Sequence, residues 1–175
     1  MANRVDSFLR LLAASDFQHE LEMEVLRAKR GRCPLSLVIF VLEFRNKNNK
    51  DVEERELIRC IGDYASPCDS LGLLPKRRYA LLLPGAEIFR ARNIAEHILQ
   101  RFENSGCNCT AGIASAKLPE NAHAETLLQQ AITTLRQNQH QSGKVSVYHE
   151  QADVLSLHKT LVHSHEKRFL FSGGE

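Results

Sequence analysis

The sequence predicts an α/β sandwich in which a central mixed sheet of about five strands is flanked by helices. Residues 35–44 form a nearly continuous apolar run rich in Val, Ile and Phe, which is typical of a strand buried on both faces. Two shorter apolar runs, 71–74 and 79–83, are close enough to form a β-hairpin. Helical stripes occur between the strands, and this alternation around a hairpin implies both parallel and antiparallel pairs in one sheet.

Four segments carry apolar residues at helical spacing and are expected to be amphipathic helices. The first covers 16–30, with Ser15 or Asp16 available as the amino-terminal cap and Gly31 as the stop. The others are expected around 52–64, 86–104 and 127–135. Their apolar stripes are Leu57, Ile61 and Tyr64; Ile88, Ala91, Ala95, Ile98, Leu99 and Phe102; and Leu127, Leu128, Ala131 and Leu135.

The strands follow from the apolar runs that remain. The polar stretch 45–51 is expected to be a loop after the central strand. The hairpin is expected to have a basic tip, and the residues of that tip are Pro75, Lys76, Arg77 and Arg78. Further strands are expected at 107–115 and 145–148, which gives the order α-β-α-β-β-α-β-α-β.

At 175 residues the chain suits one compact domain with short extensions. We expect an N-terminal extension at 1–15, the domain at 16–149 and a C-terminal tail at 150–175. In the tail, His163 and His165 could chelate a metal, although a polar connector is the favoured interpretation. The apolar run 169–171 is expected to pack on the domain, on a protein partner or in a homodimer.

Charge and hydropathy argue against two classes of partner. The formal net charge is only +2, so no global basic field indicates binding to nucleic acid or to a membrane surface. The longest apolar run is far shorter than the roughly 20 residues that span a bilayer. We therefore expect a soluble protein without nucleic-acid or membrane partners.

Cysteine usage indicates a reducing compartment. The chain has five cysteines, none in a CxxC pair, and no signal-like apolar segment near its beginning. This pattern predicts a cytoplasmic location. Cys107 and Cys109 would share one face of a strand, where a place in the core is favoured over a metal site because no second Cys/His pair lies nearby.

Four local sequences, in order, resemble diguanylate cyclase (GGDEF) domains over about residues 16–149. They are Arg27-Ala28-Lys29-Arg30 followed by Pro34-Leu35-Ser36-Leu37-Val38; Tyr79-Ala80-Leu81-Leu82-Leu83-Pro84-Gly85; Thr110-Ala111-Gly112-Ile113-Ala114; and Leu127-Leu128 with Ala131 and Leu135. Their sequential spacing carries the resemblance, because each fragment alone is common. The resemblance implies a nucleotidyl cyclase-like sandwich.

The resemblance also implies where the family's chemistry would lie. Family members hold two divalent metals on carboxylates of the signature turn and of the first strand, with GTP phosphates against the glycine backbone. Here the signature falls on residues 75–79, where Arg77 and Arg78 replace acids, and the first-strand positions fall on Phe40 and Leu42. Hard cations need oxygen ligands. We therefore expect a degenerate domain with no metal, no cofactor and no catalysis.

Two residual nucleotide-site candidates follow from the same resemblance. Asn48 matches the family's guanine-contacting asparagine, although asparagines also suit a loop. The family's product-inhibition motif Arg-x-x-Asp falls on 66–69, where only Asp69 remains. A lone Asp before a strand is more often a turn-former than a ligand contact.

The basic tip is the sharpest positive feature of the sequence. Lys76, Arg77 and Arg78 could bind phosphate or another anion, while a solvated turn is the alternative interpretation. The leading functional hypothesis is a catalytically inactive regulatory or protein-interaction module in bacterial signalling. A second is a non-catalytic receptor for a nucleotide, such as cyclic di-GMP or GTP, or for another anion. A third is a residual cyclase that uses displaced acids, with Glu43, Asp51 and Asp63 as candidates.

Overall fold

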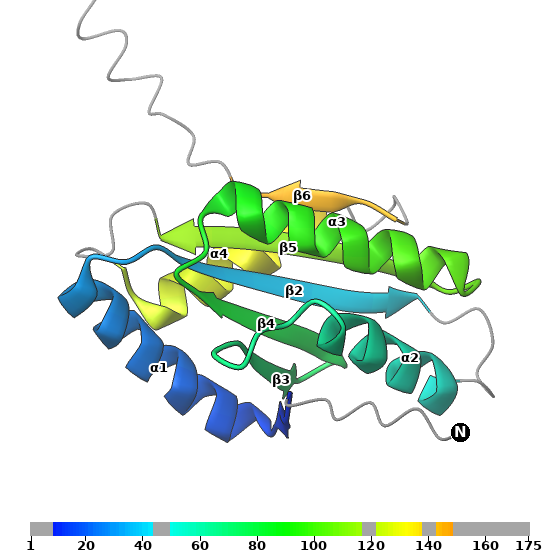
Figure 1. Cartoon of the computed structure of the whole chain (residues 1–175), viewed down its shortest axis with the longest axis horizontal. Helices are drawn as coiled ribbons and strands as arrows, with labels where there is room; N and C mark the ends of the chain where they lie inside the picture. The colour runs from blue at the N-terminus through cyan, green and yellow to red at the C-terminus, as the bar shows by residue number, and fades with distance from the viewer. Residues whose placement is uncertain (1–8, 44–49, 117–121, 138–142, 149–175) are drawn as a thin grey trace, which may run out of the picture.

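The computed structural model describes residues 9–43, 50–116, 122–137 and 143–148. These residues form four helices around a six-stranded sheet with the strand order β1-β3-β4-β2-β5-β6 (Figure 1). The elements are β1 (Leu11–Leu12), α1 (Ala14–Gly31), β2 (Leu35–Glu43), α2 (Lys50–Gly62), β3 (Ser70–Leu74), β4 (Arg78–Pro84), α3 (Ile88–Asn104), β5 (Asn108–Ala116), α4 (Ala124–Gln137) and β6 (Val145–Val147). The predicted fold class is confirmed.

β2 is the central strand, as its apolar run predicts. It pairs antiparallel with β4 on one side and with β5 on the other, so that Val38 lies between Leu81 and Ile113. Every residue from Leu35 to Phe40 is buried. A strand covered on both faces has no need of polar alternation, which explains the continuous run.

The sheet has one strand more than expected. β1 pairs in parallel with β3, opposite Leu71 and Gly72, at the edge of the sheet. It lies in the segment predicted to be an extension, because a strand of two residues shows no period that a sequence pattern could reveal. At the other edge β6 pairs in parallel with β5, so the sheet is mixed as expected.

Side chains of β2 alternate between two cores. Val38, Phe40 and Leu42 pack with α2 and α3 on one face. Leu37 and Ile39 pack with α1 and α4 on the other. Figure 1 shows α3 in front of the sheet and α4 behind it. The helical stripes predicted from the sequence are the faces that cover these cores, except that Tyr64 lies beyond the end of α2 and is 38% exposed.

Two glycines allow the helices to approach the sheet closely. A Cβ at Gly112 in β5 would lie 2.5 Å from the carbonyl oxygen of Ala131 in α4. A Cβ at Gly72 in β3 would lie 2.3 Å from the ring of Phe17 in α1. Neither space is large enough for a methyl group, so these positions fix the depth at which α1 and α4 pack.

Cys109 is buried in the core shared with α2 and α3, and Cys107 packs against the same core. The prediction of a core role for this pair is confirmed. Burial raises the pKa of the Cys109 thiol well above its ordinary value. Among the helices that the structure describes, none has the length and apolar character needed to cross a membrane.

Candidate functional site

The hairpin between β3 and β4 holds the residues onto which the sequence resemblance places the GGDEF signature. The strands pair as far as Leu74 and Arg78, so Arg78, expected in the tip, is instead the first residue of β4. Pro75, Lys76 and Arg77 form the turn. Lys76 and Arg77 have left-handed backbone, with φ of 62° and 53°, which costs a non-glycine residue roughly 1–2 kcal/mol. The turn keeps a backbone suited to glycine while it holds two cationic side chains.

Arg77 reaches across to α2. Its Nη1 lies 2.5 Å from Oε1 of Glu54. The same carboxylate acts electrostatically on Tyr79, a residue that is 1% exposed. Burial first, and Glu54 second, raise the pKa of Tyr79 above its ordinary value. Arg77 is therefore neutralised by a residue of α2, and the signature turn is tied to that helix.

The first-strand positions that would supply metal ligands are apolar and buried. Phe40 is 0% exposed and Leu42 is 6% exposed, and both pack in the core under α2 and α3. Phe40 lies opposite Tyr79 in the sheet. The two places from which carboxylates would converge are thus filled by aromatic and aliphatic side chains.

The three acids considered for a residual cyclase, which are Glu43, Asp51 and Asp63, do not come together at one site either. Glu43 ends β2 opposite Asn108, and Asp51 is exposed in the first turn of α2. Asp63 follows the other end of α2, where its carboxylate lies 3.0 Å from Arg101. A rise of 1.5 Å per helical residue separates Asp51 from Asp63 by about 18 Å. Among the described residues no group of three His, Cys, Asp or Glu could hold a metal ion.

Asp69 forms a turn at the start of β3. Its Oδ2 accepts hydrogen bonds from the backbone N–H of Ser66 at 2.7 Å and from the Ser66 hydroxyl at 2.9 Å. This geometry supports the turn-former interpretation. β3 has five residues, which span about 17 Å, so Asp69 and Lys76 lie near opposite ends of that strand. The structure does not bring these two candidates together, and Asn48 lies outside the described residues, as does the whole tail with His163 and His165.

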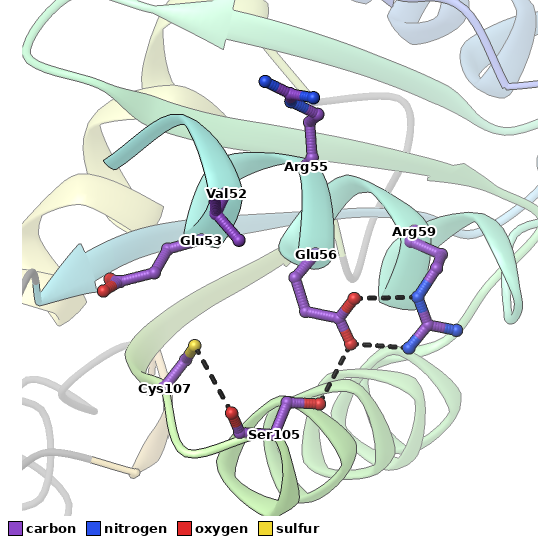
Figure 2. Close-up of a pocket in the computed structure, with 7 residues that line it drawn as sticks. All are labelled: Val52, Glu53, Arg55, Glu56, Arg59, Ser105 and Cys107. Carbon is purple, nitrogen blue, oxygen red and sulfur yellow. Dashed lines mark hydrogen bonds and ion pairs between the residues drawn. The ribbon is translucent and has the colours of Figure 1, made fainter. Parts of the chain in front are cut away.

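A groove lies between α2 and the carboxyl end of α3, the two helices that cover the same face of the sheet. Its volume is about 510 Å³, and it is lined by Val52, Glu53, Arg55, Glu56, Arg59, Ser105 and Cys107 (Figure 2). Sequence reasoning missed this group. The i, i+3 spacing of Glu56 and Arg59 could have indicated their ion pair, but no pattern in the sequence joins α2 to Ser105, the residue that follows α3.

An ion pair and a hydroxyl hold one side of the groove in place. Glu56 accepts two bonds from Arg59, from Nε at 2.8 Å and from Nη2 at 2.5 Å. The hydroxyl of Ser105 donates to Glu56 Oε1 at 2.9 Å. The Arg59 hydrogen bonds lower the pKa of Glu56 to about 2, with Ser105 adding to the effect. α2 is thereby joined to the end of α3.

The comparisons with known proteins point to one fold. No protein-family model matches the sequence, and no curated protein sequence matches it. The active GGEEF domain of a diguanylate cyclase from Vibrio cholerae is 17% identical with a TM-score of 0.73, over 81% of this chain and 100% of that chain. The GGDEF domain of DgcB from Caulobacter crescentus, in complex with c-di-GMP, is 16% identical with a TM-score of 0.71, over 86% and 97%.

A third solved structure, the FimX GGDEF domain from Pseudomonas aeruginosa, is 17% identical with a TM-score of 0.67, over 84% of this chain and 99% of that chain. Each match covers nearly the whole of the known domain, and at these identities the likeness concerns the fold. The chain therefore has the fold of a GGDEF domain, as the resemblance in its sequence implied.

Proposed function

We propose that this chain is a catalytically inactive GGDEF-like domain that acts as a regulatory or protein-interaction module in bacterial cyclic di-GMP signalling. The observation that carries the proposal is the contact between the signature turn and α2. Arg77 occupies a position where the resemblance places an acid, and it pairs with Glu54 beside the buried Tyr79.

The electrostatics of the turn support this proposal. Phosphoryl transfer between nucleotides depends on metal ions that neutralise charge around the reacting phosphate, and Mg²⁺ needs oxygen ligands. The turn presents Lys76 and Arg77 instead, and Phe40 and Leu42 fill the strand positions. A cation near Arg77 would meet repulsion where the reaction needs carboxylates.

A product assay with GTP tests the absence of catalysis. Purified chain is incubated with GTP and either Mg²⁺ or Mn²⁺, and cyclic di-GMP is quantified by chromatography. The active domain from Vibrio cholerae is the positive control. We expect product from the control alone, and metal-dependent product from this chain would support the residual cyclase instead.

A non-catalytic nucleotide receptor is the second candidate. Lys76 is exposed at the apex of the turn and Arg78 is half-buried at its base. One structural neighbour, DgcB, was solved with c-di-GMP bound. Calorimetric titrations with cyclic di-GMP, GTP and GDP distinguish the candidates. Saturable binding that Lys76→Glu abolishes would favour the receptor, whereas no binding to the wild type would favour a module that acts through a protein partner or a homodimer.

A further inference from the structure

A second groove, which we call the α3 groove, runs along one side of the first half of α3. Its volume is about 490 Å³, and its lining residues include Pro34, Glu87, Phe89, Arg90, Ile94 and His97. Positions 90, 94 and 97 have the i, i+4, i+7 spacing that places them on one side of a helix. The α3 groove shares no lining residue with the groove at the other end of this helix.

Phe89 gives the α3 groove an exposed apolar rim. The residue is 74% exposed, more than any other large apolar residue in the described part of the chain. Ile94 and Pro34 are half-buried in the lining, and His97 stacks on Tyr64 with 5.8 Å between the ring centroids. An exposed aromatic ring beside a concave surface is typical of an interaction site.

The last strand ends close to the α3 groove. β6 runs parallel to β5, and Val147 lies opposite Ile113, which pairs with Val38 of β2. Pro34 precedes Val38 by four residues, about 13 Å along the strand, and β6 lies two strand spacings, about 10 Å, from β2. The end of β6 is therefore roughly 16 Å from Pro34. Figure 1 shows β6 pointing toward the end of the sheet at which α3 begins.

The chain beyond β6 contains a short segment with the chemistry to fill this groove. Residues 149–175 lie outside the described part of the chain, and their only two phenylalanines are in the run Phe169-Leu170-Phe171. The residues before the run, Glu166-Lys167-Arg168, carry both signs of charge. The groove does so as well, through the exposed side chains of Glu87 and Arg90. Glu87 is the N-cap residue of α3, and its side chain makes no capping hydrogen bond.

The length of the intervening chain allows this run to reach the groove. Phe169 follows Val147 by 22 residues, which span up to about 70 Å when extended. That reach is several times the separation between the end of β6 and Pro34. Tethering also gives the run an effective concentration on the order of millimolar. The run of the same chain is therefore favoured over that of a second copy at micromolar concentration.

We propose that residues 169–171 dock in the α3 groove of their own chain, with a phenylalanine ring of the run packed on Phe89. The cationic residues before the run then lie near Glu87, and the docked segment covers the exposed rim. This contact is independent of the hairpin, because Arg78 lies opposite Val41 at one end of β2 and the groove lies at the other end. The outcome of a cyclase or nucleotide-binding assay therefore does not decide it.

Tryptophan fluorescence tests the proposal, because the chain contains no tryptophan. Phe171→Trp places a single indole in the run of the full chain. We expect a blue-shifted emission maximum and quenching by iodide that is several-fold weaker than for N-acetyltryptophanamide, both independent of protein concentration. Phe89→Glu in the same background removes the apolar rim, and should return emission and quenching to those of an exposed indole.

Leu26→Glu is the matched control for Phe89→Glu. Leu26 is 46% exposed on α1, which packs on the face of the sheet opposite to α3, so this variant should leave the emission unchanged. Hydrogen exchange supplies a second measurement that needs no change in the described residues. The amides of 86–97 should exchange several-fold faster in a Phe169→Ser, Phe171→Ser variant than in the wild type.

Three results would overturn the proposal. The first is an indole at position 171 that iodide quenches as freely as the model compound, which would leave the groove to another partner. The second is emission that Phe89→Glu leaves unchanged together with hydrogen exchange that the double serine variant leaves unchanged. The third is a blue shift that appears only as the concentration rises and dimers form, which would assign the run to a second copy.

Discussion

At the scale of single residues, Tyr79 anchors the hairpin in the core beneath α2. Its ring is buried, and it lies under the electrostatic influence of Glu54, which pairs with Arg77. Arg77 is half-exposed, so its ion pair is screened by solvent and contributes little. Burial of the Tyr79 ring is the more important contribution, because deleting a fully buried aromatic side chain costs about 3–5 kcal/mol.

The first prediction is that Tyr79→Ala lowers the free energy of unfolding by roughly 3–5 kcal/mol, because loss of this buried ring leaves a cavity in the core. Urea denaturation of the wild type and of the variant measures this difference. Tyr64→Ala is the matched control and should cost much less, because Tyr64 is 38% exposed and stacks on His97. Equal effects of the two substitutions would show that the buried position of the Tyr79 ring contributes nothing beyond that of an exposed tyrosine.

A second prediction concerns pH and the carboxylate of Glu56. Its pKa lies at about 2 in the folded chain against an ordinary value of 4.5. A depressed pKa means that the folded state favours the ionised form, so this stabilisation is complete above pH 4.5 and is lost as pH falls toward 2. Because Arg59 is 40% exposed, the contribution is on the order of 1 kcal/mol.

Unfolding measured by urea from pH 6 down to the lowest pH at which the fold persists tests this assignment. Glu56→Gln should reduce the loss of stability below pH 4.5, and Ser105→Ala should reduce it to a lesser degree. Glu96→Gln, whose partner Arg92 is exposed, should leave the pH profile unchanged. An unaltered acid slope in Glu56→Gln would contradict the role given to this ion pair.

At the scale of elements, the approach of α4 to β5 depends on Gly112. We predict that Gly112→Ala destabilises the fold by roughly 1–3 kcal/mol, because overpacking displaces rigid neighbours. The added methyl would lie 2.5 Å from the carbonyl oxygen of Ala131 and 2.7 Å from Leu135 Cγ. Thermal unfolding followed by circular dichroism measures the loss.

The control for this variant separates steric overlap from backbone strain. Gly106 has φ of 79° and open space around its Cα, so Gly106→Ala introduces strain without a clash. We expect the larger loss at Gly112. A Gly112→Ala variant as stable as the wild type would mean that α4 moves away from β5 without cost.

The elements also show what a sequence pattern can reveal. The apolar run of β2 and the apolar stripes of α1, α3 and α4 can be read from the sequence, because buried positions are occupied by apolar residues at the spacing of the strand or helix. β1 could not be predicted from apolar spacing, because Leu11 and Leu12 become a strand only through their pairing with β3. The placement of Arg78 was wrong by one position, since its pairing with Leu74 is a property of the register and not of its charge.

At the scale of the whole molecule, the candidate site was predictable in composition but not in geometry. The sequence itself shows Arg77 and Phe40 at the positions where the resemblance places an acid of the signature and a carboxylate of the first strand. The pairing of Arg77 with Glu54 is not visible in the sequence, because the two residues are 23 positions apart and lie on two different elements. The groove at Glu53 and Ser105 is likewise a product of how α2 and α3 pack.

The central claim is that a GGDEF fold whose hairpin pairs with α2 through Arg77 and Glu54 does not make cyclic di-GMP. The most direct measurement is a single-turnover assay, with the chain in excess over radiolabelled GTP and with Mg²⁺ or Mn²⁺ present. We predict that labelled GTP remains unchanged while the Vibrio cholerae domain converts it. Metal-dependent appearance of cyclic di-GMP that increases with the concentration of this chain would contradict the account.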